Sequence, residues 1–163
     1  ACMQSVFMYY GDEFREDVLA KAMKANSSIG TDQHEMVAFA QSIGYQAATY
    51  TDFGLDNLLR LVDKGIPVIA CVQAWAEDDG LTWAQRWYDG HYVVVVGHDT
   101  QNIYMMDPST LGNYAYVPID EFLERWHDGD DNWKGQFLRE NQMVVIAYKG
   151  KPIYNPNLVT YMA

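Results

Sequence analysis

The sequence predicts an α+β fold in which helices come first and an antiparallel sheet follows. Its 163 residues are the usual size of one domain, and a content of 49% hydrophobic and 14% aromatic residues excludes a disordered chain. Apolar residues recur at helical spacing in the first half and gather in short, strand-like runs in the second. We therefore expect one domain with a helical part over about residues 1–65, a sheet part over about 66–150 and a tail over 151–163.

The first half of the chain carries four helical patterns. Gly11, Gly44 and Gly65 each follow the last periodic residue of a pattern, which is where a helix commonly ends. Asp32 is followed three residues later by Glu35, which is similar to a capping box. The predicted helices cover residues 1–10, 14–25, 32–43 and 55–64.

The second half changes to strand-like patterns. Residues 66–74 are branched and small apolar side chains typical of a buried strand, and residues 75–89 form a polar, aromatic loop. Residues 91–98 and 103–106 have the pattern of a β-hairpin joined through 99–102. A strand over 114–117, a helix over 119–126 and a strand over 142–148 complete the prediction.

The charge and the cysteines exclude several classes of protein. The net charge is −11, so we expect no nucleic-acid partner and no binding to an anionic membrane surface. The longest apolar runs, 66–72 and 92–96, are too short for membrane insertion, and residues 1–4 do not resemble a signal peptide. Two cysteines without CxxC spacing indicate neither a zinc site nor a disulfide framework. The compartment stays open, with the cytoplasm favoured.

The predicted hairpin brings a histidine and an aspartate together. If its turn centres on Thr100, His91 lies opposite a residue near Ser109, and Asp107 is its diagonal neighbour on the same face. A slip of one residue would separate them. An imidazole oriented by a carboxylate activates a nucleophile, so the hypothesis is a general base with its orienting acid. The alternative is a histidine at a strand start that bonds a turn aspartate.

Cys2 is the leading nucleophile when the residues are considered alone. It stands at the N-terminal end of the first predicted helix, where the helix dipole favours a thiolate. Cys71 lies inside the apolar strand and is expected to be an inert core residue. Ser109 follows Asp-Pro in a turn and has no base positioned for it.

Residues 1–11 (ACMQSVFMYYG), 66–69 (IPVI), 90–95 (GHYVVV) and 106–108 (MDP) occur together in this order. In order and spacing the chain resembles the double-glycine-leader cysteine peptidases, papain-like enzymes that process bacteriocin precursors, over about residues 1–148. The resemblance implies a papain-like α+β fold and cleavage of a peptide substrate after Gly-Gly or a similar small pair. It also implies thiolate attack with His91 as base and Asp107 as orienting acid, without a cofactor. Relatives are often fused to an ATP-binding-cassette exporter, and others stand alone.

The resemblance implies a position for the nucleophile as well. The family's first helix typically opens Cys-Gly-Ala-Ala-Cys and ends Tyr-Tyr-Gly. Aligned without a gap on Tyr9, Tyr10 and Gly11, the catalytic cysteine falls about three positions before Ala1 and the oxyanion-hole glutamine further upstream. Cys2 takes the catalytic position only if about one helical turn is deleted. A start inside this motif suggests truncation or processing.

This position of the nucleophile sets the function that we expect. The chain as printed should be nearly inactive as a peptidase, because neither the thiolate nor a complete oxyanion hole is present. The alternative to a peptidase is a catalytically silent domain of the same fold that binds a peptide or partner. A transpeptidase or amidase of the same fold is a third possibility.

The sequence holds other candidate sites. Residues 128–132 (DGDDN) resemble a calcium loop, but the glycine is misplaced and Arg139 stands where a closing glutamate is needed, so a solvated acidic loop is favoured. His34, His98 and His127 are expected to be structural or at the surface, with His127 at the end of a helix. The four histidines lack metal-ligand spacing. The aromatic loop before His91 either lines a substrate groove or packs over the sheet edge, through Trp75, Trp83, Trp87 and Tyr88.

Overall fold

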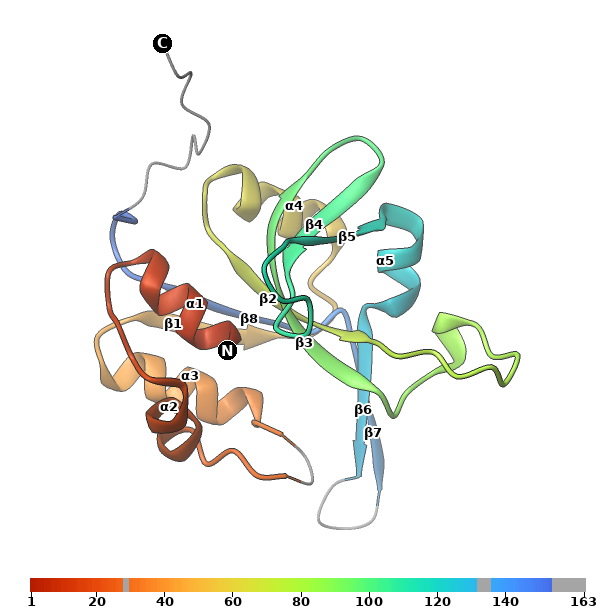
Figure 1. Cartoon of the computed structure of the whole chain (residues 1–163), viewed down its shortest axis with the longest axis horizontal. Coiled ribbons are helices and arrows are strands. Elements are labelled where there is room, and N and C mark those ends of the chain that lie inside the picture. Colours follow the sequence, from red (N-terminus) through yellow and green to blue (C-terminus); the bar gives the residue numbers. More distant parts are fainter. Residues whose placement is uncertain (28–29, 132–135, 154–163) are drawn as a thin grey trace. The chain divides into compact units, whose positions relative to one another are not determined.

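A computed structural model describes residues 1–27, 30–131 and 136–153 of the chain (Figure 1). The chain divides into two compact units, which are considered one at a time. The first unit holds residue 1, residues 3–48 and the chain from residue 147 onward. The second unit holds Cys2 and residues 49–146.

The first unit contains three of the predicted helices, each somewhat shorter than its pattern. They are α1 (Cys2–Tyr9), α2 (Glu16–Ala22) and α3 (Gln33–Ser42). Helix α3 begins where predicted, because the Asp32 carboxylate accepts a 2.6 Å hydrogen bond from the His34 backbone N–H. Glu35, which was expected to complete the cap, pairs with Lys24 at 2.7 Å.

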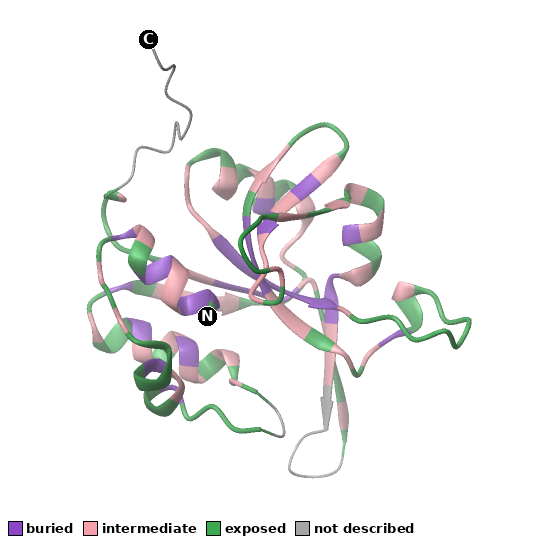
Figure 2. Cartoon of the chain, in the orientation of Figure 1, coloured by how far each residue is buried: buried purple, intermediate pink, exposed green. Residues whose placement is uncertain are grey.

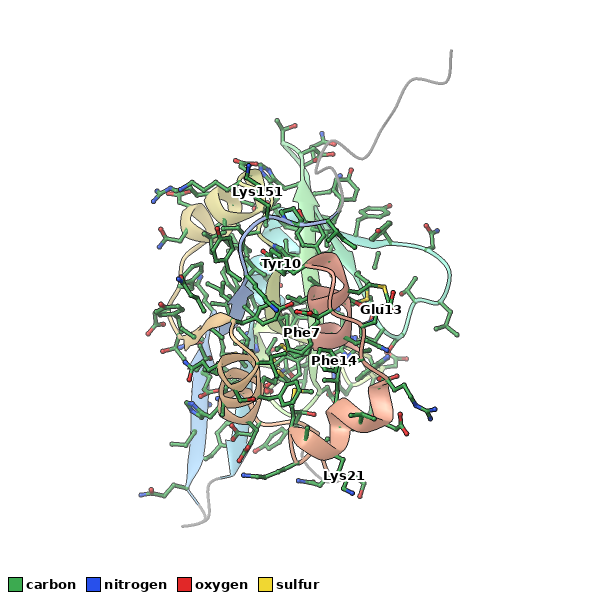
Figure 3. The ribbon with its side chains drawn as sticks, turned by 90° about the vertical axis from the view of Figure 1, so that its left-hand side faces the viewer. Phe7, Tyr10, Glu13, Phe14, Lys21 and Lys151 are labelled. Atoms are coloured by element: carbon green, nitrogen blue, oxygen red, sulfur yellow. The ribbon has the colours of Figure 1, made fainter. Side chains whose placement is uncertain are left out.

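Aromatic rings form the core of the first unit. Phe7 of α1 is fully buried, and its ring centroid lies 5.5 Å from Phe14, 5.9 Å from Phe39 and 4.9 Å from Tyr45. Figure 3 shows Phe7 beside Phe14, which lies in the segment between α1 and α2. The pairs with Phe14 and Tyr45 are edge-to-face, an arrangement worth about 0.5–1.5 kcal/mol for each pair beyond the area that it buries. The Phe7 cluster therefore joins α1 to α3 and to the start of the next strand.

The predicted antiparallel sheet is confirmed. In the second unit β2 (Val68–Gln73) pairs with β3 (Gly90–His98), β3 with β4 (Asn102–Met106) and β4 with β5 (Ala115–Pro118). Two further strands, each with residues in both units, give the strand order β1-β8-β2-β3-β4-β5. They are β1 (Gln46–Tyr50) and β8 (Val144–Tyr148).

Helices α4 (Leu55–Asp63) and α5 (Ile119–Arg125) contribute to the core of the second unit. Leu58 of α4 and Phe122 of α5 are fully buried in one cluster with alternate valines of β2 and β3. All six positions of β2 are buried, as its apolar run predicts, and Figure 2 shows this strand in purple. The N-terminal end of β3, which carries His91, thus pairs with a fully buried strand.

Three strands were not predicted. Strand β1 lies between helices in the half that was expected to be helical, and β6 (His127–Asp131) pairs with β7 (Phe137–Asn141) as a separate hairpin (Figure 1). The sequence of β6, HDGDD, has no apolar alternation, so its strand conformation comes from pairing rather than from propensity. The predicted helix over 119–126 ends at Arg125, and His127 begins β6 instead of closing a helix.

The predicted tail lies mostly outside the described residues, which end at 153. At that end the Ile153 backbone N–H donates to the carbonyl of Tyr9 at 3.2 Å, within the first unit. Over the described parts of the chain, no helix combines the length and the apolar character needed to cross a membrane.

Candidate active site

His91 and Asp107 meet in the second unit, as the sequence predicts. His91 is the second residue of β3, and Asp107 directly follows β4. His91 Nε2 lies 2.6 Å from Asp107 Oδ1, and the two side chains are only 14% and 18% exposed. The pair is thus a short, largely shielded hydrogen bond at one end of the hairpin.

A β-bulge makes this pairing possible. Next to the turn, His98 pairs with Ile103 and Gly97 with Tyr104, so the turn centres between Thr100 and Gln101 rather than on Thr100. A register shift between Val95 and Gly97 then changes the pairing by one residue. Beyond the shift Val94 pairs with Met106, which is the register that a turn centred on Thr100 would give. The predicted turn centre was wrong, and the bulge restores the shared face.

Asp107 is held as a carboxylate by its neighbours. Partial burial alone would raise its pKa, but hydrogen bonds from His91, from the Ser109 backbone N–H at 2.9 Å and from the Thr110 hydroxyl at 2.9 Å keep the pKa below its usual value. An ionised carboxylate only accepts hydrogen bonds, so Nε2 of His91 carries the proton toward it. The other ring nitrogen, Nδ1, is the atom through which His91 can exchange a proton with a reacting group.

Trp75 is a site residue whose role the sequence left open. Its ring centroid lies 4.7 Å from that of His91, with the planes tilted by 56°. The other aromatic residues of the loop pack elsewhere. Trp83 lies under the Arg125 guanidinium, Trp87 stacks on His127 and Tyr88 packs on Phe137. One member of the aromatic loop therefore faces the candidate site, and three pack against α5, β6 and β7.

A partly buried polar cluster supports the start of β3. The Asp128 carboxylate accepts hydrogen bonds from the Cys71 thiol at 3.2 Å and from the Gln73 amide at 3.3 Å. The Gln73 side-chain oxygen in turn accepts from the Asp89 backbone N–H at 3.1 Å, two residues before His91. No spacing rule pointed to this cluster, because its members come from β2 and from a hairpin that was not predicted.

Each of the three nucleophile candidates named from the sequence has a structural partner. Cys2 is 7% exposed, and its thiol donates to the carbonyl of Tyr92 at 3.1 Å. Cys71 is buried, as expected, and burial followed by the charge of Asp128 raises the pKa of its thiol well above the usual value. Ser109 donates its backbone N–H to Asp107 and so helps to hold the carboxylate.

The remaining histidines have structural partners or lie at the surface. His34 is exposed in the first turn of α3, and His98 pairs with Asp63 at 2.7 Å. His127 is buried, and its Nε2 lies 2.5 Å from the Arg86 carbonyl oxygen. Because His127 is the first residue of β6, its predicted place at a helix end was wrong.

The candidate calcium loop is not a loop over its first four residues. Asp128, Gly129, Asp130 and Asp131 belong to β6, and Asn132 lies outside the described residues. Among the described residues no group of three or more His, Cys, Asp or Glu side chains could hold a metal ion.

Comparison with known proteins gives the family and the fold of the chain. The sequence model of the Peptidase C39-like family matches residues 1–130. The fold is similar to the peptidase domain of Streptococcus ComA, a bi-functional ABC transporter involved in a quorum-sensing pathway, with a TM-score of 0.61, 19% identity and coverage of 89% of this chain and 85% of that chain. It is also similar to a Bacillus anthracis protein described as a C39-like peptidase, with a TM-score of 0.63, 17% identity and coverage of 91% and 86%.

A search of curated proteins gave no match. The family model spans most of the chain and both solved structures share its fold, so the resemblance found in the sequence is confirmed. The chain is a peptidase-like domain that belongs to the Peptidase C39-like family.

Proposed function

We propose that this domain serves the hydrolysis of peptides after a pair of small residues such as Gly-Gly, by thiolate attack assisted by His91 and Asp107. The observation that carries the proposal is the 2.6 Å contact between His91 Nε2 and Asp107 Oδ1. It supplies an imidazole oriented through Nε2, which leaves Nδ1 as the ring nitrogen for proton exchange. Family membership supports peptide bonds as the target.

In the proposed reaction a cysteine gives its thiol proton to His91 Nδ1, and the thiolate sulfur bonds to the carbonyl carbon before the scissile bond. The carbon–nitrogen bond then breaks, and the leaving nitrogen takes the proton from the imidazolium. Water attacks the resulting thioester, returning a proton through His91 to the sulfur. Asp107 stabilises the imidazolium in both halves and keeps its proton on Nε2.

The nucleophile in this proposal is the cysteine that the family alignment places about three positions before Ala1 in a longer form of the chain. Cys2 is the alternative within the printed sequence. The burial of its thiol and the hydrogen bond to the Tyr92 carbonyl fit a structural role better than attack on a substrate. The same observation favours a second candidate function for the printed chain, which is binding of a peptide without cleavage.

The neighbour ComA is described as a bi-functional ABC transporter. By this analogy, we propose that the substrate is a peptide and that the domain works next to an exporter, on the cytoplasmic side.

One experiment separates the two functions. Fluorescent peptides that contain a Gly-Gly pair are incubated with the printed chain and with a chain extended by the segment that carries the upstream cysteine. Cleavage is read by mass spectrometry, and binding by fluorescence anisotropy. The proposal expects cleavage after the small pair by the extended chain alone, lost in His91→Ala. Binding without cleavage by both chains would favour the silent domain, and neither binding nor cleavage would contradict both.

A further inference from the structure

Trp75 has a backbone conformation that is rare for a large side chain. Its φ angle is +54°, in the left-handed region that bulky residues seldom occupy. Such positions persist where the surrounding structure holds them, and they gather at binding and catalytic sites. The residue that adopts this conformation is the one whose indole contacts the His91 ring.

Trp75 lies just beyond the end of β2, and its left-handed backbone changes the direction of its side chain. Val72 pairs with His91, so their side chains share one face, and a regular continuation of β2 would turn residue 75 to the opposite face. The ladder continues one step past β2, where the Ala74 backbone N–H donates to the Asp89 carbonyl at 3.0 Å. Trp75 is the first residue beyond this anchor, and its indole nevertheless meets the His91 ring.

The contact with His91 covers only part of the surface of the Trp75 indole. Trp75 is 60% exposed, whereas the His91 side chain is 14% exposed. The ring therefore shelters the imidazole and still presents apolar surface to solvent. Glu77 and Asp78, two and three residues after Trp75 in the sequence, are also exposed.

We propose that Trp75 forms the subsite for the substrate residue that directly follows the scissile bond, and that this subsite prefers a cationic side chain. The inference rests on the proposed function. In that reaction His91 gives its proton to the leaving nitrogen, so the first residue of the leaving fragment has to lie next to the imidazole. Trp75 contacts that imidazole and is itself exposed to solvent.

The preference for a cation follows from the chemistry of this surface. The face of an exposed indole attracts a Lys or Arg side chain. Glu77 and Asp78 add negative charge within three residues of the indole, and the chain carries −11 overall. An acidic residue after the scissile bond is repelled by the same charges. At an exposed site we expect a preference of about two- to five-fold for Lys over Gln.

The test uses three peptides that differ only after the Gly-Gly pair, with Lys, Gln or Glu at that position. Binding to the chain is measured by fluorescence anisotropy, and cleavage by the extended chain as kcat/KM. The variants are Trp75→Ala, Trp75→Phe and, as a matched control, Tyr88→Ala, which removes another aromatic of the same loop that is 79% exposed.

The expected order for the wild type is Lys, then Gln, then Glu. Trp75→Ala should abolish the difference between Lys and Gln, Trp75→Phe should keep part of it, and Tyr88→Ala should leave it unchanged. If the extended wild-type chain cleaves the peptides but Trp75→Ala keeps the full preference, the subsite is overturned and the proposed function stands. If the wild type neither binds nor cleaves any of the three, the proposed function fails and takes the subsite with it.

Discussion

His91 Nε2 lies 2.6 Å from Asp107 Oδ1, although an unbroken ladder from the turn next to His98 would put the two side chains on opposite faces of the hairpin. The register shift between Val95 and Gly97 changes the pairing by one residue. Because successive side chains of a strand point to opposite faces, a shift of one residue moves the side chains beyond it to the other face. The bulge is therefore part of the machinery that brings the imidazole to the carboxylate.

Asp107→Ala is expected to release the His91 ring from a single tautomer. In the wild type the carboxylate accepts from Nε2, so ¹⁵N NMR of the ring should show the proton on Nε2 at neutral pH. In the variant the shifts should move toward a mixture of tautomers. In the extended, cleaving chain the same variant should lose about 10²–10⁴-fold in kcat/KM. Unchanged ring shifts in Asp107→Ala would contradict the pairing.

Asp107 should also contribute to stability in a pH-dependent manner. Its folded pKa lies below the usual value, since its hydrogen bonds outweigh the opposing effect of partial burial. A lowered folded pKa means that the contribution is fully present above the unfolded value, near pH 4, and is lost as the pH falls through the folded pKa. Urea denaturation should thus show wild type more stable than Asp107→Asn at pH 7, with a smaller difference at pH 3. A difference that grows on acidification would show that the sign is wrong.

The sequence predicted those parts of the fold that depend on local pattern. The apolar run around Ile69 became the fully buried β2, and Asp32 caps α3 as its position before the helical pattern predicts. Strand β6 escaped prediction because Asp128 and Gly129 have low strand propensity, and only pairing with Arg139 and Glu140 of β7 makes them a strand.

In the candidate site too, some residues could be predicted from local pattern and others could not. His91 and Asp107 could be predicted because a hairpin relates residues by simple counting. The count gave the correct pairing only because of the bulge near Val96, for which the sequence has no recognisable signal. The contact of Trp75 depends on a left-handed backbone, and that of Asp128 with Gln73 depends on an unpredicted hairpin, so neither could be read from spacing.

Two glycines of β3 should differ sharply in their tolerance of alanine. A Cβ on Gly90 would lie 2.3 Å from Asp128 Oδ1, whereas one on Gly97 would meet only the Tyr104 Cβ at 3.8 Å. The Asp128 carboxylate is held by Cys71 and Gln73 and has little freedom to yield. Gly90→Ala should cost about 1–3 kcal/mol in the free energy of unfolding.

The matched control is Gly97→Ala, which should stay within about 0.5 kcal/mol of wild type. Both values come from urea denaturation under the same conditions. Because Gly90 precedes His91, Gly90→Ala should also shift the His91 ring resonances, and Gly97→Ala should not. Equal costs for the two variants would mean that Asp128 does not limit the space at Gly90.

Cys71 should resist alkylation in the folded protein. Burial is the largest cause that raises the pKa of its thiol, and the charge of Asp128 comes second, so removing the charge alone should leave the thiol protected. In a Cys2→Ser background, iodoacetamide at pH 8 should modify residue 71 far more slowly in buffer than in urea, as read by intact mass. Adding Asp128→Asn should raise the rate in buffer only slightly, provided that circular dichroism shows an intact fold. A rate near that of the unfolded chain would instead make the Asp128 charge, rather than burial, the dominant cause.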